Sequence, residues 1–473
     1  MSAPILNQPG SWRKVRLTEV AELNPRRFND SVTDDTLVSF VPMKAVEEES
    51  GRLDPSTAKP WSTVKKGYTP FQDGDVIFAK ITPCMENGKY AVARGLHGGK
   101  AAGSTEFHVF RPSSELDPQF LLYFLFGPDV RRAARLNMRG AAGQLRVPPL
   151  FFEDLQFPLP PLDEQRKIVA EIEKQFTRLE AGVAGLRRVQ AKLKRYRAAV
   201  LKAACEGKLV PTEAELARQE GRTYETGAEL LERILTERRQ KWNGKGKYKE
   251  PAKTDVKNLS ELPEGWSWAT AEQICQFITK GTTPRADKLH SGSGEVRFLK
   301  VYNLTFTGRL DHNYKPVFID RKTHDGELAR SKVKSGDVLI NIVGPPLGQV
   351  AIVPDDVPEA NINQAIARFT PLDGVSNHFL STALRSKSVM SWAIKRAKTT
   401  AGQANLTLEL CRALPVPLPP LAEQQRIVAE VERRLSVAEE LEAVLNANVQ
   451  RATRLRQSIL QRAFEGKLAS RYD

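Results

Sequence analysis

The sequence contains few residues of the kinds that build metal centres. Its 473 residues include four cysteines, which stand singly at Cys84, Cys205, Cys275 and Cys411. There is no C-x-x-C pair and no Cys–His cluster with zinc-ligand spacing, and the six histidines are scattered. We therefore expect a reduced, cytoplasmic protein without a metal site.

Catalytic signatures are also missing from the sequence. It has no G-x-x-x-x-G-K-[ST] phosphate loop, no H-E-x-x-H, no G-x-S-x-G, and no [ND]-P-P-[FYW] run of the kind that amino-methyltransferases carry. Asp75 and Lys80 have the carboxylate-and-lysine spacing of some nucleases, but Asp337 in the similar stretch SGDVLINIV has no matching lysine. Gly-Asp before a strand is ordinary turn chemistry, so we expect no catalytic residue in this chain.

Long apolar segments are absent as well. The longest obvious run, FLLYFLF (120–126), is too short to span a membrane. The first residues, MSAPILNQPGSWRK, lack the apolar core of a signal peptide. We therefore expect no association with a membrane.

Acidic residues are outnumbered, 56 against 71 lysines and arginines, which gives a formal charge of +15. This excess favours a polyanionic partner such as nucleic acid, although many soluble proteins are basic without binding one. The length indicates at least two domains, and the hydrophobic content of 41% indicates folded ones.

One stretch of the sequence occurs twice. PLPPLDEQRKIVAEIE (158–173) returns as PLPPLAEQQRIVAEVE (417–432), and the same offset of 259 brings EGKL (206–209) onto EGKL (465–468). About 23 of the 52 aligned positions are identical, which identifies an internal repeat. Upstream the similarity is fainter: Gly143-Gln144 falls on Gly402-Gln403, and FQDGDVIFAKI (71–81) resembles VKSGDVLINIV (333–343). Each half is thus a variable unit followed by a well-preserved one.

The variable units have mixed α+β character. GDVIFAKI, SGDVLINIV, GKYAVA and GQVAIV are typical of short strands, and residues 117–136 and 376–397 each predict a helix. We expect an α+β domain of about 150 residues in each half, at 1–157 and 259–416. Between the halves, 210–258 predicts a helix near 228–242 and then a basic linker, which is either a solvated tether or a phosphate contact.

The preserved units, within 158–258 and 417–473, predict two long helices. Prolines precede each one, acidic residues occupy the first turn, and Gly207 and Gly466 are placed to cap the C-terminal ends. Apolar residues recur at heptad spacing and predict an antiparallel pair of helices, although each stripe alternatively packs on its own domain. The residues expected to pair are Val169, Ile172, Phe176, Leu179, Val183, Leu186, Val428, Val431, Leu435, Leu441 and Leu445.

Two variable domains, each followed by a long helix that opens with P-L-P-P-L-x-E-Q and closes with E-G-K-L, resemble the specificity subunit of Type I restriction–modification enzymes. LPEGWSW (262–268) and KGTTPR (280–285) strengthen the resemblance, which covers essentially the whole chain. It implies a non-catalytic subunit whose target-recognition domains each read one half of a bipartite, asymmetric DNA site. The helices would pair with pseudo-twofold symmetry and set the gap between the half-sites.

The resemblance also implies partners. Two methyltransferase subunits would bring S-adenosylmethionine, and two restriction subunits would bring ATP, Mg²⁺, the translocase and the nuclease. No cofactor is expected on this chain itself. The alternatives from the sequence are a stand-alone tandem DNA-binding protein and a single-chain enzyme with disguised motifs.

Candidate DNA contacts are the basic and amide side chains in loops of the variable units, where a solvated surface charge is the competing interpretation. In the first unit they are Arg26, Arg27, Lys44, Arg139, Gln144 and Arg146, and in the second Lys280, Thr282, Arg285, Lys300, Asn303, Lys398 and Gln403. Gln144 and Gln403 match between the copies, which favours a framework role for these two residues. Six basic residues of the first helix, between Arg187 and Arg197, are interpreted mainly as a solvated or partner-facing side.

Overall fold

The computed structural model describes residues 12–141, 143–242, 246–256, 259–400 and 403–468. The chain divides into two compact units, one made of Met1–Arg188 with Leu445–Asp473 and the other of Val189–Val444. Two 44-residue helices, α6 (Leu162–Cys205) and α14 (Leu421–Phe464), each contribute residues to both units. None of the described helices is long and apolar enough to cross a membrane.

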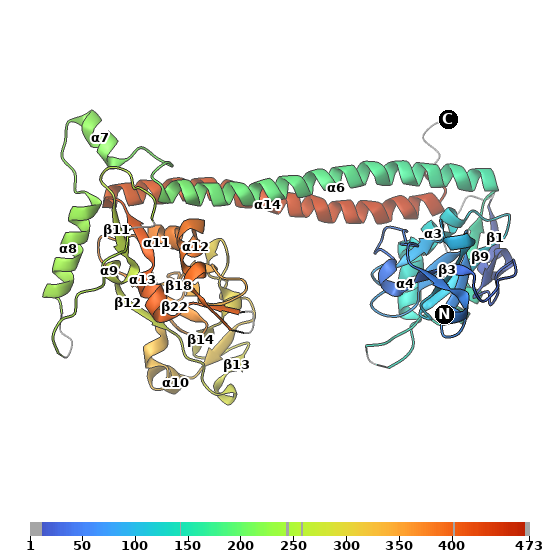
Figure 1. Ribbon diagram of the computed structural model, residues 1–473, viewed down its shortest axis with the longest axis horizontal. Helices are drawn as coiled ribbons and strands as arrows, with labels where there is room; N and C mark the ends of the chain where they lie inside the picture. The colour runs from blue at the N-terminus through green and yellow to red at the C-terminus, as the bar shows by residue number, and fades with distance from the viewer. Residues whose placement is uncertain (1–11, 142, 243–245, 257–258, 401–402, 469–473) are drawn as a thin grey trace. The chain divides into compact units, whose positions relative to one another are not determined.

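The first unit contains two four-stranded sheets, in the orders β2-β9-β6-β7 and β4-β3-β8-β5, and a two-stranded sheet of β1 and β10. Helices α3 and α4 follow the last strand of the first sheet (Figure 1). The strands are β1 (Arg13–Arg16), β2 (Ala21–Leu23), β3 (Leu37–Val41), β4 (Ala58–Pro60), β5 (Thr69–Gln72), β6 (Val76–Ala79), β7 (Tyr90–Val92), β8 (Lys100–Gly103), β9 (Phe107–Pro112) and β10 (Gln156–Leu159). The helices are α1 (Leu17–Val20), η1 (Met43–Ala45), α2 (Trp61–Val64), η2 (His97–Gly99), α3 (Pro118–Phe126), α4 (Pro128–Leu136) and α5 (Pro149–Glu153).

The second unit repeats this plan with additions. Its sheets have the orders β12-β22-β18-β20-β15, β13-β16-β14-β21-β17, β19-β24-β23 and β11-β25. The strands are β11 (Ser267–Thr270), β12 (Cys275–Lys280), β13 (His290–Ser291), β14 (Val296–Leu299), β15 (Gly308–Arg309), β16 (Val317–Ile319), β17 (Lys332–Lys334), β18 (Val338–Asn341), β19 (Val343–Gly344), β20 (Val350–Ile352), β21 (Glu359–Ile362), β22 (Ile366–Pro371), β23 (Lys398–Thr400), β24 (Gln403–Asn405) and β25 (Pro415–Leu418). The helices are α7 (Glu213–Glu220), α8 (Gly227–Gln240), α9 (Ala271–Ile274), η3 (Ala286–Lys288), η4 (Val301–Asn303), α10 (Arg321–Asp325), η5 (Ala329–Ser331), α11 (Asn377–Arg385), α12 (Lys387–Arg396) and α13 (Leu408–Ala413).

The sheet orders confirm that the variable halves share one α+β fold. The series β2-β9-β6-β7 matches β12-β22-β18-β20, and β4-β3-β8-β5 matches β16-β14-β21-β17. In the second sheet of each unit the central pair is parallel, with Val41 opposite Gly103 and Leu299 opposite Ile362. The duplication therefore extends through the variable domains, where sequence identity is faint.

Two predicted helices are interrupted. Residues 117–136 form α3 and α4 with a break at Gly127, because the Pro128 ring cannot continue an α-helix and instead starts a new one. Residues 376–397 form α11 and α12, and the hydroxyl of Ser386 caps the second helix by accepting from the Val389 amide. The short helix α7, which a Thr212–Glu215 capping box begins, was missing from the prediction.

α6 and α14 lie side by side and run antiparallel in each unit (Figure 1). In the first unit, Ile172 and Phe176 near the start of α6 share a core with Ile459 and Phe464 near the end of α14. In the second unit the order is reversed: Val200, Leu201 and Ala204 near the end of α6 share a core with Ile427, Val431 and Leu435 near the start of α14. The predicted antiparallel pairing of the two helices is thus present.

One series of buried positions on α14 recurs every seven residues. It consists of Val431, Ala438, Leu445, Ala452 and Ile459. Residues Val169, Ile172, Phe176, Leu179, Val183 and Leu186 of α6 and Val428 and Leu435 of α14 are buried or half-buried as well. Leu441 differs from the prediction, because 49% of its surface is exposed. The next residue, Glu442, takes the inward position and forms an ion pair with Arg197 at 2.6 Å.

The repeated P-L-P-P-L-x-E-Q stretch joins each long helix to the domain that precedes it. β10 and β25 end at the leucine before the two prolines, and the helix starts directly after them. The side chain of Gln165, which is fully buried, accepts from the Asp117 amide at 2.8 Å and donates to the carbonyls of Glu115 and Pro160. The motif therefore clamps the helix to the loop that begins α3.

The second copy of the motif makes the same contacts. Gln424 accepts from the Ser376 amide at 2.9 Å and donates to the carbonyls of Gly374 and Pro419. The neighbouring glutamates accept from an indole in each unit, Glu164 from Trp12 and Glu423 from Trp266, both at 2.9 Å. Burial raises the pKa of Glu423. The predicted cap glycines at the far ends, Gly207 and Gly466, are confirmed by their left-handed backbone with φ of 64° and 70°.

We predict that Gln424→Leu destabilises the protein by about 2–4 kcal/mol, because it removes a buried amide and leaves one N–H and two carbonyls without partners. Gln425→Leu is the matched control, since Gln425 is exposed on the same turn. Chemical denaturation of both variants provides the measurement. Equal losses of stability in the two variants would contradict the clamp.

Candidate nucleic-acid interface

The candidate residues of the first unit gather around a hairpin-like loop after α4. The backbones of Arg139 and Arg146 pair as an antiparallel bridge, with reciprocal N–H to carbonyl bonds of 2.9 and 2.8 Å. Ile81, two residues after the end of β6, also forms a bridge with Arg146. Gln144 is exposed near the tip of this loop. Three of the predicted residues therefore share one protruding loop.

A cavity of about 390 Å³ lies at the base of this loop. Asn24, Lys80, His108, Arg139 and Arg146 are among its lining residues. Because Arg26 and Arg27 follow Asn24 by two and three positions, the NPRR stretch begins at the same edge of the unit. Both arginines are exposed. The fold thus brings together two candidate stretches that are more than 110 residues apart in sequence.

A buried histidine fixes the floor of this cavity. His108 Nε2 lies 2.8 Å from the Val147 carbonyl, which can only accept, so this nitrogen carries the proton. His108 Nδ1 then accepts from the Asn24 amide at 3.2 Å. Burial lowers the pKa of His108 to about 4, so the ring is neutral at pH 7. The histidine therefore holds the loop in place and adds no charge to the surface.

The charges at the loop are not equally available for binding. Arg146 forms a bidentate pair with Glu106 at 2.8 and 2.9 Å, and this pair lowers the pKa of Glu106. Burial lowers the pKa of Lys80, whose side chain faces the same cavity. Arg139 is exposed and has no ion pair among the described residues. Arg139 is therefore the readiest cation of this loop for a phosphate or a base edge.

The second unit places its candidates at the equivalent edge. Lys398 lies on β23 and Gln403 on β24, in a hairpin whose register puts Lys398 opposite Asn405. Lys398 and Asn405 are the repeat partners of Arg139 and Arg146 at the offset of 259. Val343 on β19 pairs with Asn405, as Ile81 pairs with Arg146. The side chains of Lys398 and Gln403 lie outside the described part of the structure.

Backbone bonds connect this hairpin to the other candidates of the second unit. The Gly281 amide donates to the Ile366 carbonyl and the Thr282 amide to the Ile362 carbonyl, while Ile342, next to β19, donates to Ala365. Lys280, Thr282 and Arg285 are exposed. The segments that carry Lys280, Thr282, Lys398 and Gln403 therefore converge on one edge.

One candidate, Asn303, is engaged in a turn of its own domain. Asn303 is 3% exposed, and its side chain bonds the Lys300 amide and the carbonyls of Asp311 and Tyr314. All its hydrogen-bonding capacity supports the turn, so it is not free to read a base. Lys300 is half-buried beside this turn. Lys44 is exposed on η1, outside the cavity that Arg139 and Arg146 line.

Two residues at these edges escaped the sequence analysis. Lys80 belongs to the cavity, and the sequence analysis considered it only as part of a weak nuclease pair. Its supposed partner Asp75 is instead buried in a bidentate pair with Arg111 at 2.8 and 2.9 Å and caps the turn at Gln72. Asn363 follows β21 at the convergent edge, and its side-chain oxygen is buried without a partner among the described residues. Only the sheet topology places these residues, since neither belongs to a motif.

Comparison with known proteins covers both units. The profile of the family described as Type I restriction modification DNA specificity domain matches residues 9–183 and 263–451. The specificity subunits of the Type I restriction enzymes EcoEI and EcoAI from Escherichia coli are each 28% identical to this chain, over 96% of it and 83% of their own length. The specificity subunit of the Type I restriction enzyme EcoKI from Escherichia coli strain K12 is 23% identical, over 77% of this chain and 68% of its own length.

Solved structures share the fold. A chain from a study of complex assembly and conformational transition of the type I R-M system matches with a TM-score of 0.66 and 22% identity, over 97% of this chain and 99% of that one. The HsdS subunit from Thermoanaerobacter tengcongensis matches with a TM-score of 0.53 and 21% identity, over 97% of this chain and 98% of its own.

We predict that Arg139→Ala weakens binding to duplex DNA and reduces the slope of log K against log salt by about 1, because one cation leaves the phosphate contacts. Fluorescence anisotropy at several salt concentrations measures both quantities. Arg188→Ala, at an exposed position on α6, is the control and should leave the slope unchanged. An equal effect of Arg188→Ala would place the DNA on the helices instead of the hairpin.

Proposed function

Because the chain belongs to the family of Type I restriction modification DNA specificity domains, we propose that it is the non-catalytic subunit that recognises the DNA site of a Type I restriction–modification complex. The observation that carries this proposal is that both halves match the family and that each half presents a hairpin edge of basic and amide residues. Arginine, lysine, asparagine and glutamine are the side chains that read base edges in the major groove.

Each unit reads a different half of a bipartite site in this proposal. At equivalent hairpin positions the first unit has Arg139 and Arg146, where the second has Lys398 and Asn405. Arginine suits guanine and asparagine suits adenine, so equivalent positions favour different bases. Gln144 and Gln403 are identical and act as framework or as a shared contact. Asn303, which is buried and saturated, is excluded from the reading set.

The paired helices set the gap between the half-sites. The core of each unit contains residues from the start of one long helix and from the end of the other. A change in the length of either helix would therefore affect both units. An antiparallel pair of repeated helices relates its two ends by a pseudo-twofold axis. Duplex DNA has local twofold symmetry, and dimeric DNA-binding proteins match it with two chains.

The helices also carry the docking surface for the methyltransferase subunits. On α14, Val437, Leu441 and Val444 are 50%, 49% and 56% exposed, and they lie one helical turn apart. Val189 and Tyr196 on α6 are 44% and 42% exposed and occupy the flank that faces the same side in an antiparallel heptad pair. The opposite flank of α14 meets the domain, through Glu439 and Arg309 at 3.1 Å.

Such an apolar strip on a helix pair fits apolar helices of a partner, which would complete a bundle. The methyltransferase subunits supply S-adenosylmethionine in this proposal, and two restriction subunits supply ATP, Mg²⁺ and the nuclease. The described residues include no group of three or more metal-ligating side chains, and the four cysteines are free. The proposal assigns catalysis to the partners because both halves of the chain match a family of DNA specificity domains.

We predict that Leu441→Glu abolishes co-purification with the methyltransferase subunit and leaves DNA binding by the chain unchanged, since a charge in the strip would have to be desolvated on docking. Glu440→Gln is the control, because Glu440 is exposed on the neighbouring face. Co-expression followed by affinity purification is the measurement. Retention of the methyltransferase by Leu441→Glu would remove the strip from the docking surface.

Exchange of domains tests the function itself. Replacing residues 1–157 by the corresponding part of another family member is expected to change one half of the methylated sequence and leave the other half and the gap intact. Genome-wide mapping of methylated adenines in cells that carry the chimera and its methyltransferase partner gives the result. A change in both half-sites would rule out independent reading by the two domains. Unchanged methylation would mean that residues 1–157 do not recognise the DNA.

A further inference from the structure

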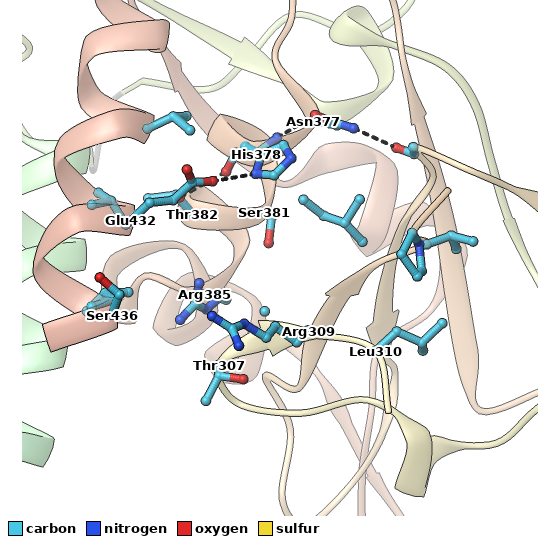
Figure 2. Close-up of a pocket in the computed structure, with 18 of the residues that line it drawn as sticks. Thr307, Arg309, Leu310, Asn377, His378, Ser381, Thr382, Arg385, Glu432 and Ser436 are labelled. Carbon is cyan, nitrogen blue, oxygen red and sulfur yellow. Dashed lines mark hydrogen bonds and ion pairs between the residues drawn. The ribbon is translucent and has the colours of Figure 1, made fainter. Parts of the chain in front are cut away.

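The second unit encloses a cavity of about 1080 Å³ between its variable domain and the first half of α14. Figure 2 shows Arg385, Ser381 and Arg309 from the domain and Ser436 from the helix around this space. The cavity lies away from the β19-β24-β23 hairpin and on the flank of α14 that faces the domain. It therefore belongs neither to the reading edge nor to the exposed apolar strip.

One cation in this cavity lacks a partner. Arg385, the last residue of α11, forms no hydrogen bond or ion pair with any described residue, and its Nε is buried. Burial lowers the pKa of Arg385 to about 10, with Glu439 acting in the opposite direction, so the side chain is still cationic at pH 7. Arg385 as a whole is half-buried. A buried N–H such as the one on its Nε normally has a hydrogen-bonding partner, because leaving it unpaired is costly.

The acids that line the cavity are already engaged. Glu432 accepts from His378 at 2.8 Å (Figure 2), and Glu439 pairs with Arg309 at 3.1 Å. The remaining two acids contact residues of the variable domain. Asp356 lies 3.5 Å from His312, and Asp355 accepts a hydrogen bond from Ser335. Each of these acids therefore has a partner within the chain, and Glu439 is the one whose partner is an arginine, while Arg385 forms no ion pair with any described residue.

In the first copy of the repeat, buried apolar side chains occupy the region that corresponds to this cavity. At the offset of 259, Arg385 corresponds to Phe126, Ser381 to Leu122 and Thr382 to Tyr123. The three residues of the first unit are buried. Phe126 and Leu122 pack beneath Gly51, where an added Cβ would lie 2.9 Å from the Leu122 side chain.

The second unit has the same backbone pairing at this glycine, but the side chains beneath it are polar. Gly308 pairs with Ala351 on the neighbouring strand as Gly51 pairs with Ala91, and both glycines have positive φ. An added Cβ at Gly308 would lie 2.7 Å from the Arg385 guanidinium. The two copies therefore differ mainly in chemistry: apolar side chains pack under the strand in one copy, and an unpaired arginine with two hydroxyls lines a cavity in the other.

We propose that this cavity binds a small ligand that carries one anionic group, a phosphate or a carboxylate, on an apolar body. Arg385 pairs with the anion, and the hydroxyl of Ser381 lies at the same cavity to donate a hydrogen bond to it. The hydroxyls of Thr382 and Ser436 already donate to the carbonyls of His378 and Arg433 and only line the cavity. Leu310, Val353 and Val431 supply apolar wall for the rest of the ligand. The volume is at the upper end of the range of ligand pockets, roughly 300–1,000 Å³.

The experiment uses the full chain and three probes. Phenyl phosphate and phenylacetate separate the two anions on a similar body, and inorganic phosphate tests the anion without a body. Isothermal titration calorimetry is expected to show saturable binding of at least one of the two aromatic probes in the millimolar range or tighter. Absence of saturable binding by both would overturn the proposal and leave solvent as the partner of Arg385.

Three variants assign the binding to this cavity. Arg385→Gln should weaken the binding at least about tenfold, because a charge-assisted hydrogen bond is lost. Arg330→Gln, an exposed arginine of the same domain, should bind as the parent does. Unchanged binding by Arg385→Gln would move the ligand elsewhere and overturn the proposal.

The third variant copies the first unit. Ser381→Leu with Thr382→Tyr and Arg385→Phe should fold, melt at a temperature no lower than the parent, and bind none of the probes. If it folds and still binds the probes, the cavity is not the site. DNA binding by the three variants reports on the proposed function separately, since the hairpin residues are untouched.

Discussion

Mutual burial of the apolar stripes on α6 and α14 is the constraint on which the rest of this structure depends. A 44-residue helix with one apolar face is not stable alone in water, and each stripe lacks enough domain surface to cover it. The two helices cover each other, and their ends enter the domain cores. Phe464 packs on Phe120 and Phe124 in the first unit, and Ala204 and Leu201 share a core with Phe379 in the second. Each unit is therefore completed by both helices.

Charged residues within this seam favour one register of the helices. Arg197 and Arg456 are repeat partners, and each reaches a glutamate of the opposite helix: Glu442 at 2.6 Å and Glu180 at 3.4 Å. Arg456 also lies over the Phe176 ring, with its guanidinium carbon 4.3 Å from the centroid. Polar residues in an otherwise apolar helix seam penalise shifted pairings more than they stabilise the correct one. The proposed role of the helices in setting the gap between half-sites requires a single register, since a slip by one heptad would change the length of the paired region.

The two copies are alike where a domain meets the helices and differ elsewhere. Gln165 and Gln424 make the same three contacts, and Phe120 and Phe379 occupy the same core position. At the end of α3 the first copy has the apolar Phe126, where the second copy has the charged Arg385 at the end of α11. The hairpins also differ in their basic and amide side chains. Such a division lets the variable domains diverge in sequence while the attachment of each domain to its long helix is retained. The proposed reading role is consistent with this division.

The sequence by itself determined the duplication, the two long helices with their cap glycines, and the α+β class, because heptad spacing, proline and glycine positions and strand alternation are local signals. It also gave Arg139, Gln144, Arg146, Lys398 and Gln403 as candidate DNA contacts, because they are basic or amide side chains, and the match of Gln144 with Gln403 favoured a framework role for that pair. It did not determine that Leu441 faces outward, that Asn303 supports a turn, or that Gln165 and Gln424 each clamp a long helix to a loop 48 to 50 residues upstream. Those outcomes follow from sheet register and helix packing, which bring distant segments together and decide which side of each residue is buried. Arg385 is the clearest case, because only the tertiary structure shows that it forms no ion pair with any described residue.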